Sequence, residues 1–111
     1  MFNISLEENA MRFMLTVRMP HEKFNAAVKD GSAGRKLGHI LEEAKPEAVY
    51  FTEQNGQRSA FLIVNLESAS QIPSYAEPWF LTFGADVEFK AVMTPEDLQK
   101  SGLDTLGKKW A

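Results

Sequence analysis

Hydrophobic and polar residues alternate in the first patterned stretch of the chain, from Met11 to Met19. Phe13, Leu15 and Val17 point to one side and the residues between them to the other, which is the period of a β-strand. Pro20 ends this strand and suits the first turn of a helix. The chain therefore opens its fold with a strand that leads directly into a helical region.

The helical region shows apolar residues at the spacing of one helix face. They form an earlier and a later group: Phe24, Ala27 and Val28, then Leu37, Ile40, Leu41 and Ala44. The segment from Asp30 to Gly34 separates the groups and is rich in glycine, so we expect it to break or kink the helix. Lys45 and Pro46 close the region.

A hairpin forms the centre of the predicted sheet. Its strands are Glu47 to Gln54 and Ser59 to Leu66, and the second is the longest apolar run in the chain. Asn55 and Gly56 fit a two-residue type I′ turn, because both central positions of that turn need a positive φ. We expect the second strand to lie centrally, with both faces covered.

The turn sets the register of the hairpin. Glu53 should face Arg58 and Tyr50 should face Phe61. A charge pair and an aromatic pair across neighbouring strands are both favourable, which supports this register.

The second half of the chain predicts a helix and a strand. Ser68 or Ser70 suits the N-cap of a helix that runs to Phe83. Pro78 removes an internal hydrogen bond, so we expect this helix to be short or irregular. Asp86 to Met93 then alternates as a fourth strand.

Two segments lie outside this pattern. Residues 1–10 lack periodicity and are interpreted as an N-terminal extension, whereas residues 11–111 are expected to form a single domain. Thr94 to Asp97 start a terminal helix, with threonine at the N-cap, proline at the first position and acids in the first turn. We expect that helix to stop near Gly102 and the last residues, through Trp110, to dock elsewhere.

The element order is β-α-β-β-α-β followed by a tail helix. It predicts an α+β fold of the ferredoxin-like type, with a four-stranded antiparallel sheet in the order 4-1-3-2. One face of every strand is apolar and should pack on the two helices. The residues on that face are Phe13, Leu15, Val17, Val49, Phe51, Ala60, Leu62, Val64, Val87, Phe89 and Ala91.

The opposite face of the predicted sheet is mixed. It would carry a continuous apolar patch if left in water, formed by Met14, Tyr50, Phe61, Ile63 and Val92. Two helices cover only one face of a sheet, so something else must cover this one.

The chain resembles the uncharacterised bacterial members of the dimeric α/β-barrel superfamily. The resemblance is carried by the opening Met11 to Leu15, by the hairpin and by Asp86 to Phe89, and it covers about residues 11–94. Sheets of that superfamily pack face to face across a two-fold axis, so the resemblance implies a homodimer with a cavity. Its members include cofactor-free monooxygenases, lactone isomerases, haem-dependent enzymes and proteins of no known activity, so it implies no single reaction.

Charge and cysteine content exclude several classes of function. The net charge is −3 and the pI about 5.4, which argues against a nucleic-acid partner bound by phosphate neutralisation. The absence of cysteine removes disulfides, thiol nucleophiles and thiolate metal sites. No run approaches the length of a membrane span and residues 1–10 lack signal-peptide features, so we expect a cytoplasmic protein with no membrane partner.

Polar side chains gather at one end of the mixed face. Arg18 ends the first strand, His21 starts the following helix and Glu88 lies in the fourth strand. Arg18 suits the binding of a carboxylate or enolate, and His21 or Glu88 suits proton transfer. The remaining ligand-binding candidates are apolar walls and one amide: Tyr50, Phe61, Trp79 and Asn65.

Each of these residues also has a plain structural interpretation. Arg18 and Glu88 can pair with each other, His21 is typical of an exposed first turn, and Trp79 is typical of a helix-to-sheet core. His21 and His39 lack the spacing of paired metal ligands, so we expect no metal site, and no motif implies a cofactor.

Two functions follow from the sequence. The first is a homodimeric small-molecule-binding protein, or a cofactor-free enzyme of monooxygenase or isomerase type, acting on a small organic acid. The second is a non-catalytic assembly or regulatory module whose mixed face is only a dimer interface.

Overall fold

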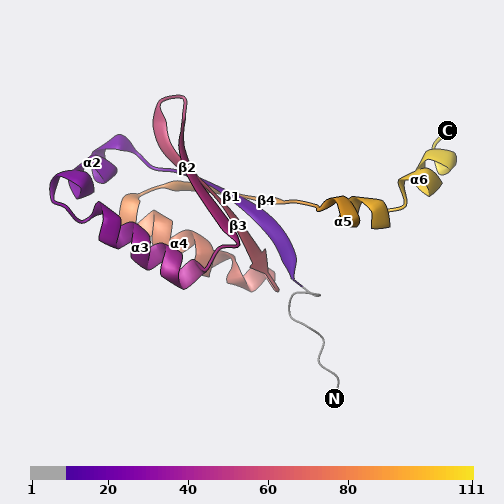
Figure 1. Cartoon of the computed structure of the whole chain (residues 1–111), viewed down its shortest axis with the longest axis horizontal. Coiled ribbons are helices and arrows are strands. Elements are labelled where there is room, and N and C mark those ends of the chain that lie inside the picture. Colours follow the sequence, from indigo (N-terminus) through magenta and orange to yellow (C-terminus); the bar gives the residue numbers. More distant parts are fainter. Residues whose placement is uncertain (1–9) are drawn as a thin grey trace, which may run out of the picture.

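The computed structural model describes residues 10–111 as an α+β fold with a four-stranded antiparallel sheet (Figure 1). The strands are β1 (Met11–Arg18), β2 (Ala48–Gln54), β3 (Gln57–Leu66) and β4 (Asp86–Ala91). The helices are α2 (His21–Lys29), α3 (Ala33–Ala44), the 3-10 turn η1 (Ala69–Gln71), α4 (Ile72–Phe83), α5 (Pro95–Lys100) and α6 (Leu103–Lys109).

The strands lie in the order β2-β3-β1-β4, so β1 and β3 form the centre. Read from the β4 edge, the same neighbours give 4-1-3-2. The chain departs from a plain βαββαβ pattern at two places, because two helices follow β1 and two more follow β4. The break between α2 and α3 falls at Asp30–Ser32, inside the segment where the glycines predict it.

The predicted register of the hairpin is confirmed. Tyr50 faces Phe61 and Glu53 faces Arg58. Asn55 and Gly56 have φ angles of 53° and 81°, both in the left-handed region that a type I′ turn requires. A local turn signal therefore sets the pairing of two whole strands.

The expected charge pair in that hairpin does not form an ion pair. The Arg58 guanidinium donates to Asn25 Oδ1 at 2.7 Å and lies 4.7 Å from the centre of the Phe24 ring. Glu53 Oε1 instead accepts a hydrogen bond from the Gly56 amide at 2.8 Å. Both side chains have better-placed partners, so the register is stabilised by the turn and by the Arg58 contacts on α2.

The hydrophobic core lies between the sheet and helices α2, α3 and α4. The central strands bury most of one face, through Leu15, Val17, Ala60, Leu62 and Val64, and Phe13 on the same face is partly buried. The helices contribute buried residues that include Phe24, Ala27, Ile40, Trp79 and Phe83. The Phe24 and Phe83 rings lie 5.0 Å apart, which joins α2 to α4 inside the core.

The apolar face is less completely packed at the sheet edges than the sequence predicts. Phe51 on β2 is 51% exposed, and Ala91 on β4 is exposed as well. The helices cover the central strands and leave the edges partly uncovered. Strand alternation shows which face of the sheet a residue lies on, but not how close it lies to the edge of the sheet. The prediction that Phe51 and Ala91 pack on the helices is therefore wrong.

Helix α4 corrects a second prediction, because it is regular over twelve residues despite Pro78 in its interior. Ala76, Trp79 and Phe83 are all buried from this helix, and their packing outweighs the hydrogen bond that Pro78 removes. Ser68 caps the preceding 3-10 turn, and not α4 itself, through a capping box with Gln71.

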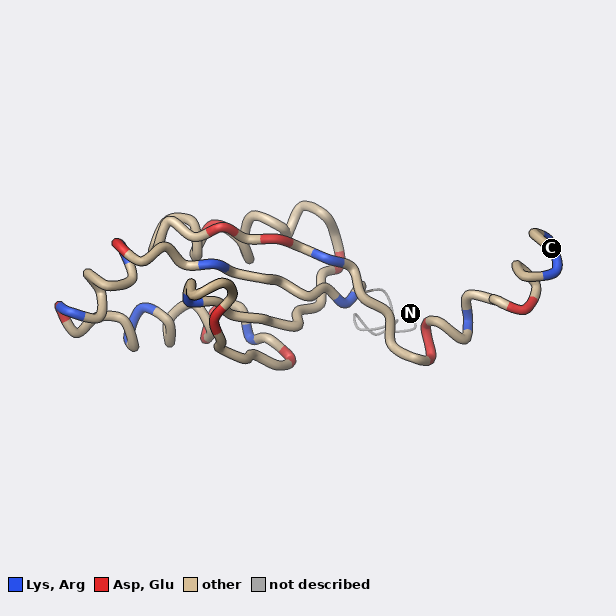
Figure 2. The backbone as a smooth tube through the Cα atoms, turned by 90° about the horizontal axis from the view of Figure 1, so that it is seen from above, with Lys and Arg blue, Asp and Glu red and all other residues tan. Residues whose placement is uncertain are grey.

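The chain after β4 forms an arm that projects from the body (Figures 1 and 2). We call residues 93–111 the C-terminal arm; it contains α5 and α6. Thr94 caps α5 as predicted, with Asp97 completing the capping box. The prediction missed α6 and extended β4 to Met93, two residues beyond its observed end.

The arm makes the molecule elongated. The radius of gyration is 17.6 Å, whereas a compact chain of this length has one of about 13 Å. The longest extent, 58 Å, includes the arm. The structure therefore consists of a layered body and an extension with little contact to it.

Candidate functional site

One face of the sheet carries no helix among residues 10–111 (Figure 1). We call it the open sheet face and define it by the alternating side chains that point away from the core. They are Arg12, Met14, Thr16, Arg18, Ala48, Tyr50, Thr52, Gln54, Gln57, Ser59, Phe61, Ile63, Asn65, Asp86, Glu88 and Lys90.

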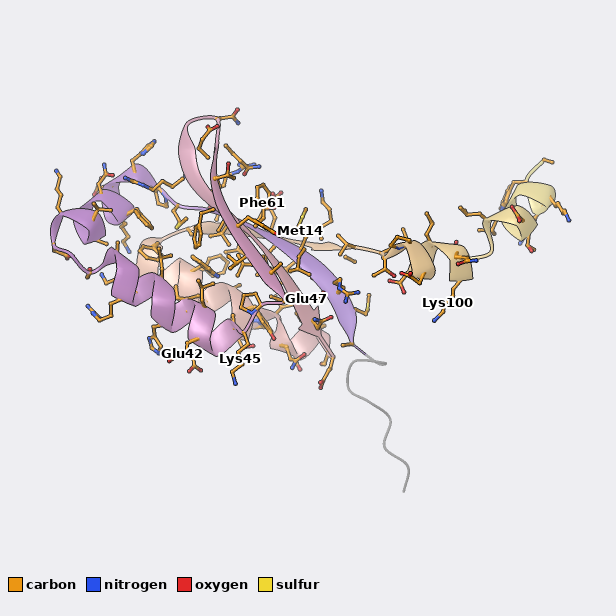
Figure 3. The ribbon with its side chains drawn as sticks, viewed as in Figure 1. Met14, Glu42, Lys45, Glu47, Phe61 and Lys100 are labelled. Atoms are coloured by element: carbon orange, nitrogen blue, oxygen red, sulfur yellow. The ribbon has the colours of Figure 1, made fainter. Side chains whose placement is uncertain are left out.

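The centre of the open sheet face is apolar. Met14 faces Ile63, and in the next row Phe61 lies between Thr16 and Tyr50. Figure 3 shows Met14 and Phe61 side by side in the middle of the sheet. Tyr50 is 68% exposed, and the other three apolar side chains are half-buried by their neighbours. Four of the five residues of the predicted patch therefore lie together on this face, whereas Val92 follows the end of β4 and lines the hollow beside α5.

The predicted polar site lies at one end of this face. Arg18 faces Asp86 on one side and Ser59 on the other, and its Nε donates to Gln54 Oε1 at 3.2 Å. Glu88 belongs to the next row, opposite Thr16. Arg18 and Glu88 thus share the face, but within the described part of the chain they form no ion pair.

Of the other predicted site residues, Asn65 and Trp79 lie apart from Arg18 and Glu88. His21 is exposed at the first residue of α2, immediately after the strand that carries Arg18. Asn65 lies at the opposite end of the open sheet face. Trp79 is fully buried in the core on the other side of the sheet, so it does not wall a site with Tyr50 and Phe61.

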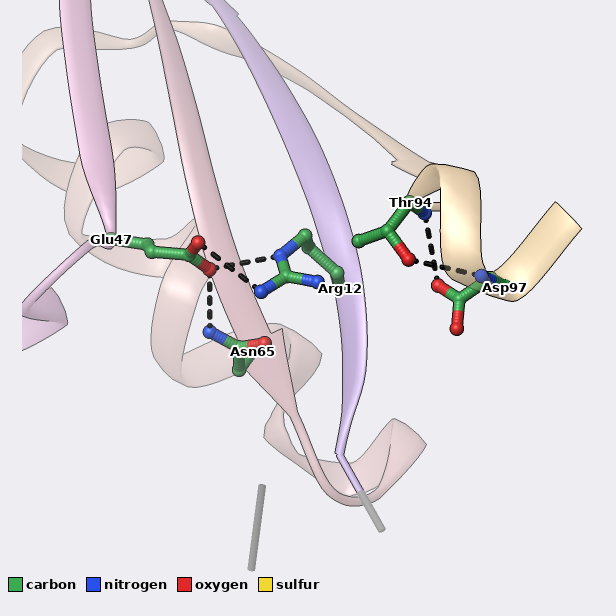
Figure 4. A network of polar contacts seen from close by, with 5 residues as sticks. All are labelled: Arg12, Glu47, Asn65, Thr94 and Asp97. Carbon is green, nitrogen blue, oxygen red and sulfur yellow. Dashed lines mark hydrogen bonds and ion pairs between the residues drawn. The ribbon is translucent and has the colours of Figure 1, made fainter. Parts of the chain in front are cut away.

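A second polar cluster occupies the end where Asn65 lies (Figure 4). Arg12 Nε donates to Glu47 Oε1 at 2.9 Å and Arg12 Nη2 donates to Glu47 Oε2 at 3.2 Å. Asn65 Nδ2 adds a third hydrogen bond, to Glu47 Oε1 at 3.1 Å. This is a bidentate arginine–carboxylate pair, a geometry that fixes both side chains.

The ion pair shifts the pKa values of both side chains in opposite directions. The hydrogen bond from Arg12, followed by that from Asn65, lowers the pKa of Glu47 below its ordinary value. The same carboxylate raises the pKa of Arg12. Glu47 therefore stays charged further into the acidic range than an isolated glutamate.

An open hollow of about 1140 Å³ lies beside this cluster, between the sheet and α5. Its lining includes Arg12, Glu47, Asn65, Val92, Asp97 and Lys100. Asp97 is held in place by Thr94: the Asp97 amide donates to Thr94 Oγ1 at 3.1 Å, and the Thr94 amide donates to Asp97 Oδ2 at 3.0 Å. The hydrogen bond from the Thr94 amide, followed by the contribution of the Thr94 hydroxyl, lowers the pKa of the Asp97 carboxyl.

Sequence reasoning missed Glu47 as a partner of this face. Alternation from Val49 would place Glu47 over the core, but a bend at Glu47 precedes β2 and directs its carboxylate to Arg12. Arg12 could have been found, because it lies two residues before Met14 on the same face. Its pairing with a residue 35 positions away in the chain could not.

Neither a histidine–carboxylate metal cluster nor a bilayer-length apolar helix occurs among residues 10–111. No group of three or more histidine, aspartate or glutamate side chains in this range is arranged to hold a metal ion. No helix in the same range has both the length and the apolar content needed to cross a bilayer.

Comparisons with known proteins assign no family to the chain. No protein-family model, curated protein or solved structure matches it. The geometric feature that bears most on function is the open sheet face, with its apolar centre and charged ends.

Proposed function

We propose that this protein is a homodimer whose two open sheet faces lie against each other, in the ferredoxin-like arrangement of the dimeric α/β-barrel superfamily, and that it binds a small organic acid between them. The uncovered apolar centre of the sheet carries this proposal. Met14, Phe61 and Ile63 occupy neighbouring positions on the two central strands, where a monomer would leave them facing water.

The charge pattern of the face supports a second copy as the partner. Cationic and anionic side chains both occur on it, with Arg18 and Lys90 on one hand and Asp86 and Glu88 on the other. A two-fold interface brings each residue of one copy against a different residue of the other, so a surface with both signs can complement itself. An apolar centre with a polar rim is also the usual anatomy of an interface.

The ligand site we propose lies at the Arg18 end. A guanidinium can hold a carboxylate in a bidentate manner, and Tyr50 and Phe61 supply apolar walls in the adjoining row. Glu88 or His21 would transfer a proton if the protein is an enzyme. The partner's face would exclude water, which strengthens each of these polar interactions.

A second candidate is an assembly module that holds no ligand. The specific observation in its favour is that the arginines of the face already have partners. Arg18 donates to Gln54, and Arg12 is held by Glu47. Because these cations already bind partners within the chain, the face needs no anionic ligand, and a second copy of the protein is a sufficient partner.

Native mass spectrometry of the freshly purified protein tests both candidates. A mass near twice 12.5 kDa with an additional small molecule supports the ligand-binding dimer. A dimer with nothing bound supports the assembly module. A monomer at micromolar concentrations contradicts both candidates.

The Arg18→Ala variant separates the two roles of that residue. If Arg18 binds the ligand, the added mass is lost while the dimer remains. If Arg18 only supports the interface, the dimer itself dissociates. Arg35→Ala is the matched control, because Arg35 is an exposed arginine on α3, within the helical layer.

A further inference from the structure

The C-terminal arm carries apolar side chains that nothing covers. Their exposed fractions are 66% for Met93, 43% for Leu98, 56% for Leu103, 43% for Leu106 and 77% for Trp110. Single exposed apolar residues are ordinary, but five within one nineteen-residue segment indicate a docking surface.

The helices of the arm are too short to be stable alone. Helix α5 has six residues and α6 has seven, with Gly107 inside α6. Isolated helices below about twelve residues are marginal in water, and stability then depends on packing of an apolar face. The arm therefore requires a surface to pack on.

The body of the same chain does not provide that surface. In both Figures 1 and 2 the arm leaves the end of β4 and runs away from the sheet and its helices. Figure 3 shows Lys100 on α5 well away from Met14 and Phe61 in the sheet centre.

The lysine end of the arm complements the two acids of β4. Lys108 and Lys109 end α6, at the far end of the arm (Figure 2). Asp86 and Glu88 lie on β4 at the end of the open sheet face opposite to Arg12 and Asn65. Across residues 10–111 neither acid forms an ion pair, so both are available to cations from outside.

The area also fits an association between two copies. Five large side chains at these exposures offer on the order of 500 Å². A standard interface buries about 800 Å² per partner, so the arm adds a substantial share to what the sheet face supplies. In a two-fold dimer this contribution is made twice, once by each arm.

We infer that the arm of each copy packs along the β4 edge of a second copy's open sheet face, beside the contact between the two sheets, with its lysine end at Asp86 and Glu88. This inference rests on the proposed homodimer and adds an exchange of arms to it. The exchange gives α5 and α6 the packing surface that their own body lacks.

Cysteine cross-linking tests the contact directly, because the natural chain has no cysteine. A Lys108→Cys protein is mixed with a Glu88→Cys protein and oxidised, and the mixed disulfide dimer is measured by mass. Disulfides need Cα atoms within about 7 Å, so we expect about tenfold more product than for the control mixture of Lys108→Cys with Glu77→Cys. Glu77 is an exposed acid on α4, on the helical side of the sheet.

Trp110 provides a second readout that needs no engineered contact. The chain has two tryptophans, and Trp79 is buried, so acrylamide quenching reports mainly on Trp110. We expect Trp110 to become protected from acrylamide over the same protein concentrations at which sedimentation shows the dimer forming.

The outcomes separate this inference from the proposed function. A dimer with Trp110 still accessible, and with equal cross-linking of the Glu88 and Glu77 variants, overturns the arm exchange and leaves the sheet-face dimer intact. A monomer in which Trp110 is protected shows that the arm folds onto its own body, which overturns both.

Discussion

At the scale of residues, the ion pair between Arg12 and Glu47 predicts a pH dependence of stability. The pKa of Glu47 is lower in the folded protein than its ordinary value of 4.5. A group of this kind contributes stability above its unfolded pKa, and the contribution is lost as the pH falls through the folded pKa. The contribution should therefore be complete near neutral pH and fade below about pH 4.5.

The variants Glu47→Gln and Arg12→Gln test this by denaturant unfolding as a function of pH. Both should lower the unfolding midpoint slightly at pH 7, because the pair is exposed and screened by solvent. The difference from the natural protein should shrink as the pH is lowered into the acidic range. A difference that stays constant down to pH 3 would show that the loss does not come from the ion pair.

Two substitutions of the buried Trp79 should differ in how much they lower the free energy of unfolding. The side chain is fully buried, but its indole Nε1 has no hydrogen-bond partner. Trp79→Ala should cost about 3–5 kcal/mol of unfolding free energy through lost contacts and a cavity. Trp79→Phe should cost much less, because it keeps an aromatic ring and removes an unpartnered buried donor.

Chemical denaturation of both Trp79 variants measures this contrast. Equal losses for phenylalanine and alanine would mean that an aromatic ring at this position contributes nothing to packing, and the packing account of this site would fail.

At the scale of elements, two glycines in helices should respond to alanine in opposite directions. Gly84 ends α4 with a φ of 64°, a left-handed conformation that disfavours a side chain. Gly84→Ala should destabilise the protein by about 1 kcal/mol. Gly38 lies inside α3 with open space where a Cβ would stand, so Gly38→Ala should stabilise it by about 0.5–1 kcal/mol.

Thermal unfolding of the two variants checks the signs. A stabilising effect of Gly84→Ala would mean that the helix ends differently from the structure described here.

The elements that the sequence predicted well are those set by local chemistry. Asn55 and Gly56 require positive φ angles together, and that requirement places every residue of the hairpin opposite its partner. Thr94 with Asp97 likewise marks the start of α5. A turn or a cap depends on a few neighbouring residues, so it can be recognised without knowing the rest of the fold.

The elements that were missed depend on packing or on long-range contacts. Pro78 weakens a helix locally, yet α4 is regular because its buried residues hold it against the sheet. Glu47 joins Arg12 only because a bend before β2 turns its side chain to the open sheet face. Helix α6 contains Gly107 and has weak intrinsic propensity, so no local pattern marks it.

At the scale of the whole molecule, the structure brings together only some of the residues that the sequence predicted for the site. Alternation correctly placed Arg18, Tyr50, Phe61 and Glu88 on one face. Trp79 had two interpretations, as a wall of the site and as a residue of the helix-to-sheet core, and the structure bears out the second. What binds to the face stays a prediction from the sequence.

In the dimer that we propose, a second copy of the chain covers the open sheet face. This proposal rests on the apolar centre of that face and on the absence of any covering helix among residues 10–111. Ile63 lies at this centre, between Met14 and Ala48 in neighbouring strands. Leu81, which is 75% exposed on α4, offers a matched apolar position on the helical side.

The most direct test is sedimentation equilibrium of the natural protein and of the Ile63→Glu and Leu81→Glu variants, with circular dichroism to confirm that each is folded. The account predicts a mass near twice 12.5 kDa for the natural protein and for Leu81→Glu, and a folded monomer for Ile63→Glu. A natural protein that stays monomeric, or a dimer that Leu81→Glu dissociates and Ile63→Glu does not, would contradict it.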